Sequence, residues 1–401
     1  MKGDVHDEKL RSVVAPEGWS NPVPDGRYNL VVLGGGTAGL VCAVGAAGLG
    51  AKVALVEKDA LGGDCLNTGC VPSKSLLASS HRAKALQEAS LFGIAGPKTV
   101  KVDFSGVMER LRRVRAELAP HDGVERLTNA GVDVFFGEGR FVDVDRIAVD
   151  GVELLFRRAV IATGRRPLLP NLKGLDTVGY LTSETIFSLT ERPRRLIVLG
   201  GGPIGVEMAQ AFSRLGSDVT LVEAGPALLP RDDPDAVSVL TETLEADGVR
   251  ILTNCTAVSV ARKGKSCVLR LSRDGQEDDE RGDAFLVATG RTPTLKGLGL
   301  QAAGVRVEGG GGLVLDDFLR TTNPAVFAAG DVASAFQFTH TADAMARIVI
   351  QNSLFGGRRK VSDLIVPWCT YTDPEVAQVG MTSAQACGDG VAFDLWEEPF
   401  A

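Results

Sequence analysis

The chain has 401 residues, of which 44% are hydrophobic and 5% aromatic, with 48 glycines and a formal net charge of −7. This length allows two or three domains, and the glycine content favours an α/β protein with many tight turns. The acidic balance argues against a nucleic-acid partner. No apolar run is long enough to span a membrane, and residues 1–25 resemble a polar leader without a signal-peptide core. We therefore expect a cytoplasmic protein without a membrane partner.

The first predicted unit is a dinucleotide-binding βαβ segment. A strand at 29–33, a small-residue helix over 40–50 and a second strand at 52–56 follow one another, and Glu57 ends the second strand. Glycines at the first turn let the backbone approach a pyrophosphate at the helix N-terminus, and the acidic residue binds ribose hydroxyls. The glycines with GxGxxG spacing are Gly34, Gly36 and Gly39.

Two closely spaced cysteines come directly after this unit. Residues 62–74 read GGDCLNTGCVPSK, which leaves four residues between Cys65 and Cys70. Such a pair closes a small disulfide ring, and a nearby positive charge or helix N-terminus lowers a thiol pKa enough to give a reactive thiolate. The alternatives are a metal half-site or two unrelated core thiols. The upstream nucleotide unit and the flanking glycines and Pro72-Ser73-Lys74 favour a redox pair, and we assign no metal site.

The other cysteines and a run of arginines carry no predicted chemistry. Seven cysteines with one closely spaced pair do not indicate a secreted disulfide framework. We interpret Cys42, Cys255 and Cys267 as packing residues. The arginines at 110, 112, 113 and 115 alternate with apolar residues on a predicted helix, and we interpret them as a solvated helix face.

The same nucleotide-binding pattern returns later in the chain. A strand at 196–199 precedes a second glycine turn, and a strand at 218–222 ends at Glu223. Two such units indicate two dinucleotides, which would suit a tightly held flavin and a nicotinamide. Glu223 favours a free 2′-hydroxyl, hence NAD(H) over NADP(H), although Arg231 offers an alternative site for a 2′-phosphate. The glycines of this turn are Gly200, Gly202 and Gly205.

Two nearly identical sequence motifs flank the second unit. VIATGRRP at 160–167 and LVATGRTP at 286–293 each form an apolar strand that ends in Ala-Thr-Gly and a basic residue. We interpret them as crossings of the chain between two domains, with a nicotinamide-sized unit over 166–288. A charged segment at 273–283 fits a hairpin loop within that unit.

Together these motifs resemble the class I pyridine nucleotide-disulfide oxidoreductases, the flavoprotein family of dihydrolipoamide dehydrogenase, glutathione reductase and mercuric reductase. The resemblance implies two Rossmann-like domains, one for FAD over 26–165 and 289–360 and one for NAD(P) over 166–288. It also implies the start of an α+β interface domain over 361–401.

The resemblance assigns site residues as well. Cys65 would be the redox-active thiol that faces the substrate and Cys70 the thiol that faces the flavin. Lys74 would lie near the flavin and pair with Glu207. The alternative interpretation is that Lys74 is a solvated surface lysine. Asp331, in FAAGDVA, would bind the ribityl chain. Gly34, Gly36, Gly39 and Glu57 would bind FAD, and the further cofactor-binding candidates are Thr163, Gly164, Gly290 and Gly330.

The activity implied is electron transfer from a nicotinamide through FAD to the Cys65–Cys70 disulfide and then to an acceptor. GCVPSK occurs in dihydrolipoamide dehydrogenases and mercuric reductases, so the acceptor would be a lipoamide-type disulfide or mercuric ion. The chain stops before the HPxxxE segment that supplies the family's base, and His6, His81, His121 and His340 offer no substitute. A redox sensor, an inactive truncated subunit and a diaphorase are therefore alternatives. Family members form homodimers, and we expect this shortened chain to dimerise poorly.

Overall fold

The computed structural model describes residues 4–97 and 99–399 of the chain, so the outermost ends of both terminal segments lie outside the described residues. Its first unit is built on a sheet with strand order β3-β2-β1-β6-β5-β4, in which β16 also pairs with β6. The pairs β3–β2, β2–β1, β1–β6 and β6–β16 are parallel. The strands are β1 (Tyr28–Leu33), β2 (Val53–Glu57), β3 (Val132–Phe136), β4 (Arg140–Asp143), β5 (Arg146–Val149), β6 (Val152–Ile161) and β16 (Val326–Ala328).

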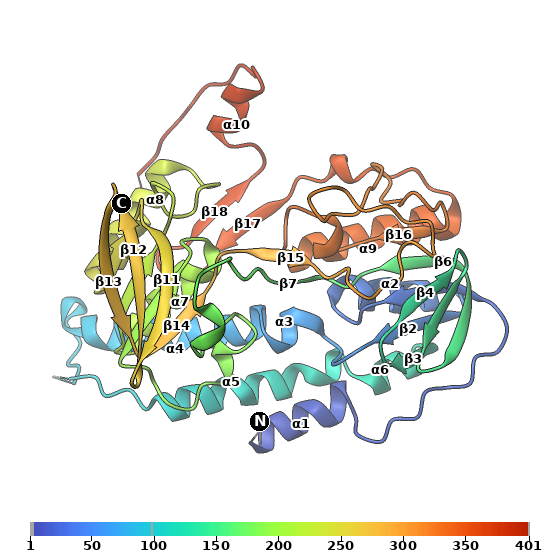
Figure 1. Cartoon of the computed structure of the whole chain (residues 1–401), viewed down its shortest axis with the longest axis horizontal. Coiled ribbons are helices and arrows are strands. Elements are labelled where there is room, and N and C mark those ends of the chain that lie inside the picture. The colour runs from blue at the N-terminus through green and yellow to red at the C-terminus, as the bar shows by residue number, and fades with distance from the viewer. Residues whose placement is uncertain (1–3, 98, 400–401) are drawn as a thin grey trace.

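Helices cover this sheet because its central strands are apolar on both faces. Every residue of β2 is buried, as expected for an inner strand of a parallel sheet. Helices α2 (Thr37–Gly48) and α9 (Thr339–Phe355) pack against each other beside the sheet, at the right of Figure 1. The predicted strand–helix–strand order of the first unit is confirmed. Helix α6 (Val124–Asn129) precedes β3.

The second unit has a parallel sheet of its own, with order β10-β9-β8-β14. Its strands are β8 (Arg195–Leu199), β9 (Asp218–Val222), β10 (Val249–Leu252) and β14 (Ala284–Val287), and its helices are α7 (Pro203–Arg214) and α8 (Pro234–Ala246). The chain is thus an α/β protein with two Rossmann-like units, as predicted.

A three-stranded antiparallel sheet covers the second unit, and here one expectation was wrong. Strands β11 (Thr256–Lys263), β12 (Ser266–Arg273) and β13 (Gln276–Gly282) follow one another, so most of the charged segment 273–283 is strand. The turn itself is only Asp274-Gly275, both with positive φ. Charged residues suit β13 because β12 is its only partner strand in the described part of the chain and most of its residues are exposed.

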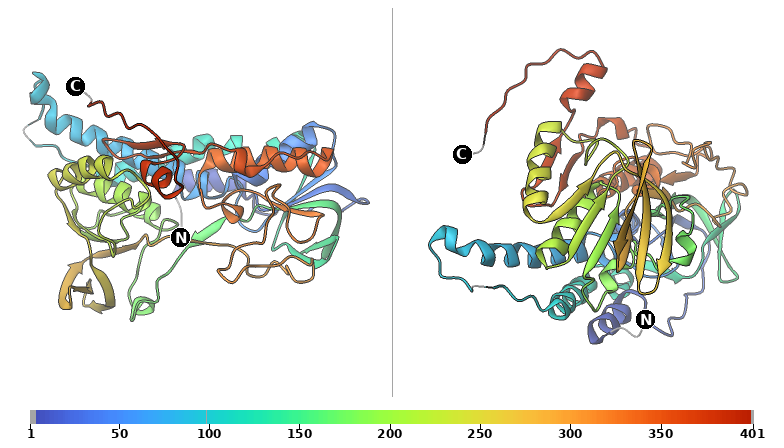
Figure 2. Two further views of the ribbon diagram at one scale, coloured as in Figure 1. Left: turned by 90° about the horizontal axis from the view of Figure 1, so that it is seen from above. Right: turned by 60° about the vertical axis from the view of Figure 1, so that its left-hand side comes forward.

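The two phrases with Ala-Thr-Gly meet where the chain crosses between the units. Strands β7 (Arg165–Pro167) and β15 (Arg291–Pro293) form an antiparallel pair and run side by side through the middle of Figure 1. Below them, α3 (Gly63–Asn67) leads into α4 (Cys70–Glu88), which packs on α5 (Phe104–Leu118) and on α7. Both views in Figure 2 show the far end of α4 projecting from the rest of the molecule.

The segment 1–25 is more than a polar leader, because it contains helix α1 (Val5–Val14). Leu10 and Val14 are buried, and the helix lies along α5 in Figure 1. The expected solvated arginine face is also wrong in part. The side chains of Arg112 and Arg115 are only 12% and 11% exposed, and they pair with Asp4, the N-cap of α1, and with Asp7 of α1. Charge alternation could not reveal a partner more than a hundred residues away.

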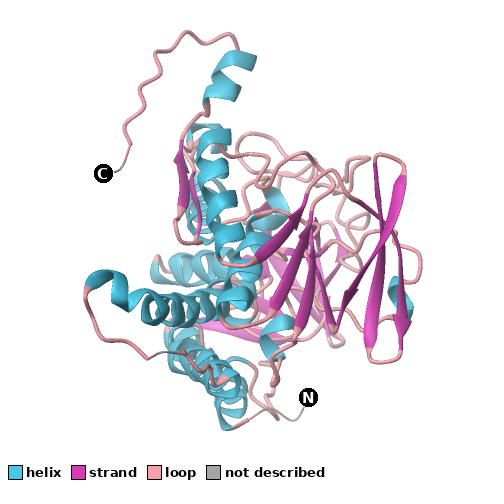
Figure 3. Cartoon of the chain, turned by 90° about the vertical axis from the view of Figure 1, so that its left-hand side faces the viewer, coloured by secondary structure: helices cyan, strands magenta, loops and turns pink. Residues whose placement is uncertain are grey.

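The interface segment begins with a hairpin of β17 (Pro367–Thr370) and β18 (Val376–Val379), joined through Asp373-Pro374-Glu375 as predicted. Figure 3 shows the following helix α10 (Ser383–Gly388) and the last described residues standing away from the two units. The 3₁₀ turns are η1 (Ala89–Phe92), η2 (Ala119–His121), η3 (Leu175–Thr177), η4 (Ile186–Ser188), η5 (Asp331–Ala333) and η6 (Val361–Asp363). Among the described residues, no helix is both long and apolar enough to cross a membrane.

Candidate active site

The first glycine turn forms a cradle that only glycine permits. Gly34 has φ +107°, and a Cβ on it would lie 2.3 Å from the main-chain oxygen of Ala162. A Cβ on Gly39 would lie 1.8 Å from the oxygen of Gly34, so α2 starts in direct contact with the end of β1. Gly36 caps α2 without a side-chain hydrogen bond, which leaves the first N–H groups of the helix for a ligand. A diphosphate fits this arrangement.

Glu57 is fixed beside that cradle. Its carboxylate accepts hydrogen bonds from the main-chain N–H of Gly35 at 2.6 Å and of Asp59 at 2.9 Å. Burial raises the pKa of Glu57, and these two N–H donors oppose the shift. The carboxylate therefore stands at the end of β2 in a fixed orientation, where the sequence predicted a ribose contact.

The second glycine turn repeats the first in detail. Gly200 has φ +113°, with a hypothetical Cβ 2.5 Å from the oxygen of Ala288, and a Cβ on Gly205 would lie 1.9 Å from the oxygen of Gly200. Gly202 caps α7 without a side-chain hydrogen bond. The Glu223 carboxylate accepts from two main-chain N–H groups, at 2.6 and 2.7 Å. The two cradles therefore suit the same kind of ligand.

The cysteine pair lies directly against the first cradle. Cys65 is on α3 and Cys70 is the first residue of α4, and both are free thiols in this structure. A Cβ on Gly63, the first residue of α3, would come within 2.6 Å of the Gly36 Cα. The loop with the two thiols thus begins in contact with the proposed diphosphate site.

The two thiols have opposite proton affinities. The pKa of Cys70 is lowered to about 6, because the Cys65 thiol donates a hydrogen bond to its sulfur, and the Thr339 hydroxyl and Lys74 lower it further against burial. The Thr339 oxygen lies 3.3 Å from the Cys70 sulfur. Donating that hydrogen bond, together with burial, raises the pKa of Cys65. Cys70 is thus the thiolate of the pair and Cys65 the thiol.

Lys74 is held by the second unit, in the contact implied by the sequence. Its Nζ lies 3.0 Å from both carboxylate oxygens of Glu207, a residue of α7 that is 5% exposed. The main-chain N–H of Tyr371 donates a hydrogen bond to the same carboxylate at 3.0 Å. The centre of the Tyr371 ring lies 4.4 Å from the Lys74 Nζ. This arrangement fixes one positive charge a helical turn beyond Cys70. Thr339 and Tyr371 belong to no motif that pointed to this site.

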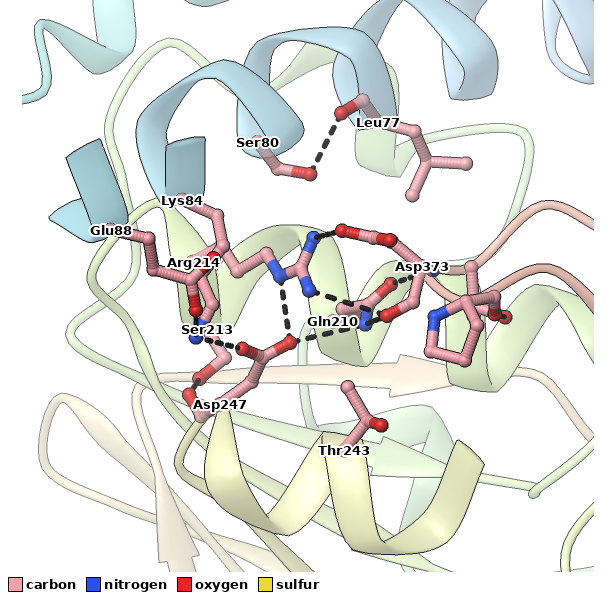
Figure 4. Close-up of polar contacts among 12 residues, drawn as sticks. Leu77, Ser80, Lys84, Glu88, Gln210, Ser213, Arg214, Thr243, Asp247 and Asp373 are labelled. Carbon is pink, nitrogen blue, oxygen red and sulfur yellow. Dashed lines mark hydrogen bonds and ion pairs between the residues drawn. The ribbon is translucent and has the colours of Figure 1, made fainter. Parts of the chain in front are cut away.

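A polar cluster farther along α7 fastens the segment with Tyr371 (Figure 4). Arg214 donates to the Asp247 carboxylate at 2.6 Å and to the Asp373 carboxylate at 2.7 Å. Gln210 exchanges hydrogen bonds with the main chain of Asp373 at 2.8 and 2.9 Å. The Arg214 and Asp247 side chains are 2% and 1% exposed, so the two charges compensate each other away from water. We call Gln210, Arg214, Asp247 and Asp373 the α7 clasp.

Asp331 lies at the start of η5, after Gly330, and pairs with Arg291, which was not among the predicted site residues. Arg291 Nη1 lies 2.8 Å from the Asp331 carboxylate, and Arg291 also contacts the Asp64 carboxylate. Burial raises the pKa of Asp331, and Arg291 opposes the shift. The sequence could have identified Arg291, because it is the basic residue of the repeated motif LVATGRTP. It links the turn of Asp331 to the cysteine loop.

The two Ala-Thr-Gly phrases bond across the domain crossing in similar ways. The Thr163 hydroxyl donates to the oxygen of Thr294 at 2.8 Å, and the Thr289 hydroxyl donates to the oxygen of Leu168 at 2.9 Å. Gly164 and Gly290 follow these threonines, both with positive φ. The predicted cofactor residues Thr163, Gly164 and Gly290 therefore form the joint between the units.

The histidines were expected to provide no base, and the structure gives His340 a structural contact. His340 opens α9, as predicted, and its Nε2 lies 2.7 Å from the main-chain oxygen of Pro367. This contact ties α9 to the start of the interface hairpin.

Comparison with known sequences identifies the family of this site. The profile described as pyridine nucleotide-disulphide oxidoreductase matches residues 28–346. The chain belongs to this family. Among its relatives, a mercuric reductase from Bacillus cereus is 35% identical over 362 residues, and a dihydrolipoyl dehydrogenase from Bacillus subtilis (strain 168) is 35% identical over 378 residues.

These relatives are longer than the present chain. The match to the Bacillus cereus protein covers 90% of this chain and 57% of that protein, and the match to the Bacillus subtilis protein covers 92% and 79%. A solved structure, the Cu(II) complex of the HOCl-induced flavoprotein disulfide reductase RclA from Escherichia coli, aligns with TM-score 0.79 and 31% identity. That alignment covers 90% of this chain and 79% of the other. The family fold thus extends over most of the described residues.

Proposed function

We propose that the chain is an FAD-dependent NAD(P)H disulfide oxidoreductase in which Cys65 and Cys70 form the redox-active pair. The observation that carries this proposal is the position of Cys70. It lies beside the first cradle, has a lowered pKa, and precedes Lys74, whose partner Glu207 belongs to the second unit. A reactive thiolate at the meeting point of two dinucleotide cradles suits electron transfer to a disulfide.

The residues of the first unit fit FAD. The N-terminus of α2 would take the diphosphate, Glu57 a ribose, and Asp331 the ribityl chain. FAD bound there would carry two electrons between a nicotinamide and the cysteine pair. The protein's own part is to hold the Cys70 thiolate with Thr339 and Lys74, and to keep a proton on Cys65 until an acceptor arrives.

The second cradle would bind the nicotinamide cofactor, and two features favour NAD(H). The Glu223 carboxylate at the end of β9 is fixed by two N–H donors and would repel a 2′-phosphate. Arg231, the alternative phosphate ligand, instead donates to the main-chain oxygen of Ala335 at 3.3 Å. We expect a higher kcat/KM for NADH than for NADPH, and a smaller ratio in Glu223→Ala.

The acceptor would be a small disulfide or a soft metal ion. The relatives named mercuric reductase and dihydrolipoyl dehydrogenase suggest mercuric ion or lipoamide as first compounds to test. Cys65 would react with this acceptor, because the family resemblance gives Cys65 the position that faces the substrate and Cys70 the position that faces the flavin.

The test begins with purified protein, its flavin content, and NADH oxidation with lipoamide, Hg(II) or a quinone. We expect turnover with at least one acceptor, loss in Cys65→Ser and Cys70→Ser, and retention in Cys387→Ser, which changes an exposed thiol. Protein that binds no flavin would contradict the proposal. Turnover that persists in both site variants would instead favour a diaphorase, which needs no thiols.

A further inference from the structure

Helix α1 is connected to the loop between the two cysteines through Arg115, a residue of α5. The Nη1 of Arg115 donates to the main-chain oxygen of Asn67 at 2.8 Å, and its Nη2 donates to the Asp7 carboxylate at 2.6 Å. Asn67 is one of the four residues between Cys65 and Cys70. One guanidinium group therefore bridges α1 and the redox loop.

A second route from α1 ends at the same residue. The N–H of Leu61 donates to the oxygen of Val14, the last residue of α1, at 3.0 Å. The side-chain amide of Asn67 donates back to the oxygens of Leu61 at 3.1 Å and of Gly63 at 2.9 Å. The main chain and the side chain of Asn67 are thus both connected to α1.

These contacts are shielded from water. The Arg115 side chain is 11% exposed, the Asp7 side chain 27%, and Val14 is fully buried. Hydrogen bonds with a charged donor in such surroundings are stronger than those between neutral groups. Helix α1 also lies outside the matched family region, residues 28–346.

We propose that α1 positions the redox-active cysteines by fixing Asn67, with Asp7 and Arg115 as positioning residues. This inference rests on the proposed function, since it concerns the cycle of Cys65 and Cys70 between dithiol and disulfide. On ring closure the Cys65 thiol loses its proton, the Cys70 thiolate supplies the other sulfur, one S–S bond forms, and two electrons pass to an oxidant. Fixing the middle of the loop limits its motion and raises the effective concentration of one sulfur at the other.

The chain contains a matched control for this bridge. One turn earlier on α5, Arg112 pairs with Asp4 at the N-terminal end of α1, and the exposures are 12% and 32%. This pair also joins α1 to α5, but Arg112 has no hydrogen bond to the cysteine loop among those of the described residues. Loss of either pair weakens the docking of α1, and loss of the Arg115 bridge alone should affect the cysteines.

The experiment measures the dithiol–disulfide equilibrium of the purified protein. Wild type, Arg115→Gln and Asp7→Asn are equilibrated with mixtures of oxidised and reduced dithiothreitol, the oxidised form accepting the two electrons and two protons. Acid quenching, alkylation and mass spectrometry then give the fraction with a Cys65–Cys70 bond. We expect the closure constant of Arg115→Gln to fall by about tenfold, as for loss of a hydrogen bond from a charged donor, and that of Asp7→Asn to fall less. The near-isosteric Asp7→Asn keeps the test valid if Arg115→Gln fails to fold.

Arg112→Gln and Asp4→Asn should leave the closure constant within about twofold of wild type, although thermal unfolding should show a similar loss of stability. Equal shifts in the two arginine variants, or an unchanged constant in Arg115→Gln and Asp7→Asn, would overturn the proposal. A wild-type protein that forms no Cys65–Cys70 bond at any ratio would instead refute the proposed function.

Discussion

The two thiols of the candidate site differ because they occupy different positions on the backbone. Cys70 starts α4, where helix N–H groups and Lys74 favour a negative charge, and it accepts a hydrogen bond from Cys65. Cys65, on the preceding short helix, donates that hydrogen bond and keeps its proton. In the proposed function, Cys70 would therefore hold the negative charge and Cys65 would react with the acceptor.

This asymmetry predicts the pH dependence of alkylation. A pKa lowered to about 6 means that Cys70 is mostly thiolate above pH 6, so its rate with iodoacetamide should be half-maximal near that pH. In Cys65→Ala the midpoint should move up toward the ordinary value of 9.0, because the main cause of the shift is removed. Peptide mass spectrometry of Cys70 after timed labelling provides the rates, with Cys387→Ser as the control. A wild-type midpoint near 9.0 would rule out the stabilised thiolate.

At the level of elements, the sequence correctly predicted the helices, strands and turns that depend on residues close together in the chain. The two glycine turns, their strands and the acids Glu57 and Glu223 follow from steric demands near one βαβ unit, and all are present. Helix α1 was missed because it has few buried apolar residues and gains its stability from Arg112 and Arg115 on a distant helix.

The same limit explains the other errors. The charged residues of β13 suggested a loop because the sequence does not show that the strand is exposed. Thr339 and Tyr371 lie far from the cysteines in sequence, and only tertiary packing brings them to Cys70 and Lys74. Contacts of this kind carry no local signal.

Helix α2 offers a direct test of the first cradle. In Gly39→Ala the new Cβ would lie 1.8 Å from the oxygen of Gly34, so the helix must move away from β1. We expect a loss of about 3 kcal/mol in stability and little bound FAD. Gly48→Ala, at the other end of the same helix with no atom within 4 Å of its Cβ, should keep both properties. Normal flavin content in Gly39→Ala would show that the turn does not hold the diphosphate.

The α7 clasp should contribute strongly to stability. Arg214→Met would leave the Asp247 carboxylate, which is 1% exposed, with Lys84 as its remaining ionic partner. Loss of the hydrogen bonds from the buried guanidinium should then cost about 1–3 kcal/mol. Chemical denaturation measures this loss. Arg347→Met is the control, since Arg347 pairs with Asp343 on the surface of α9 and should show no measurable change. Similar results for the two variants would mean that the clasp is dispensable.

For the whole molecule, the position of one unit relative to the other determines whether the two cradles serve one site. Connections between the units include the paired strands β7 and β15, the Lys74–Glu207 pair, and the pair that Lys84 of α4 makes with Asp247 of the second unit. The two ion pairs hold helices that carry site residues, whereas the strand pair β7–β15 holds the segments where the chain passes between the units. If the crossing loosens, each unit should stay folded while the alignment of the cradles suffers.

Thr289→Val tests this joint, since it removes the hydroxyl that donates to the oxygen of Leu168 and keeps the shape of the side chain. A neutral hydrogen bond contributes about 1 kcal/mol, so hydrogen exchange of β7 and β15 should become about fivefold faster. NADH-dependent reduction should slow while FAD content stays normal, because transfer between the cradles depends on their alignment. Thr177→Val is the matched control, because the hydrogen bond that its hydroxyl makes among residues 4–97 and 99–399 lies within a local turn, to the oxygen of Gly174. Faster exchange in both variants, or in neither, would show that this hydrogen bond does not hold the two units in place.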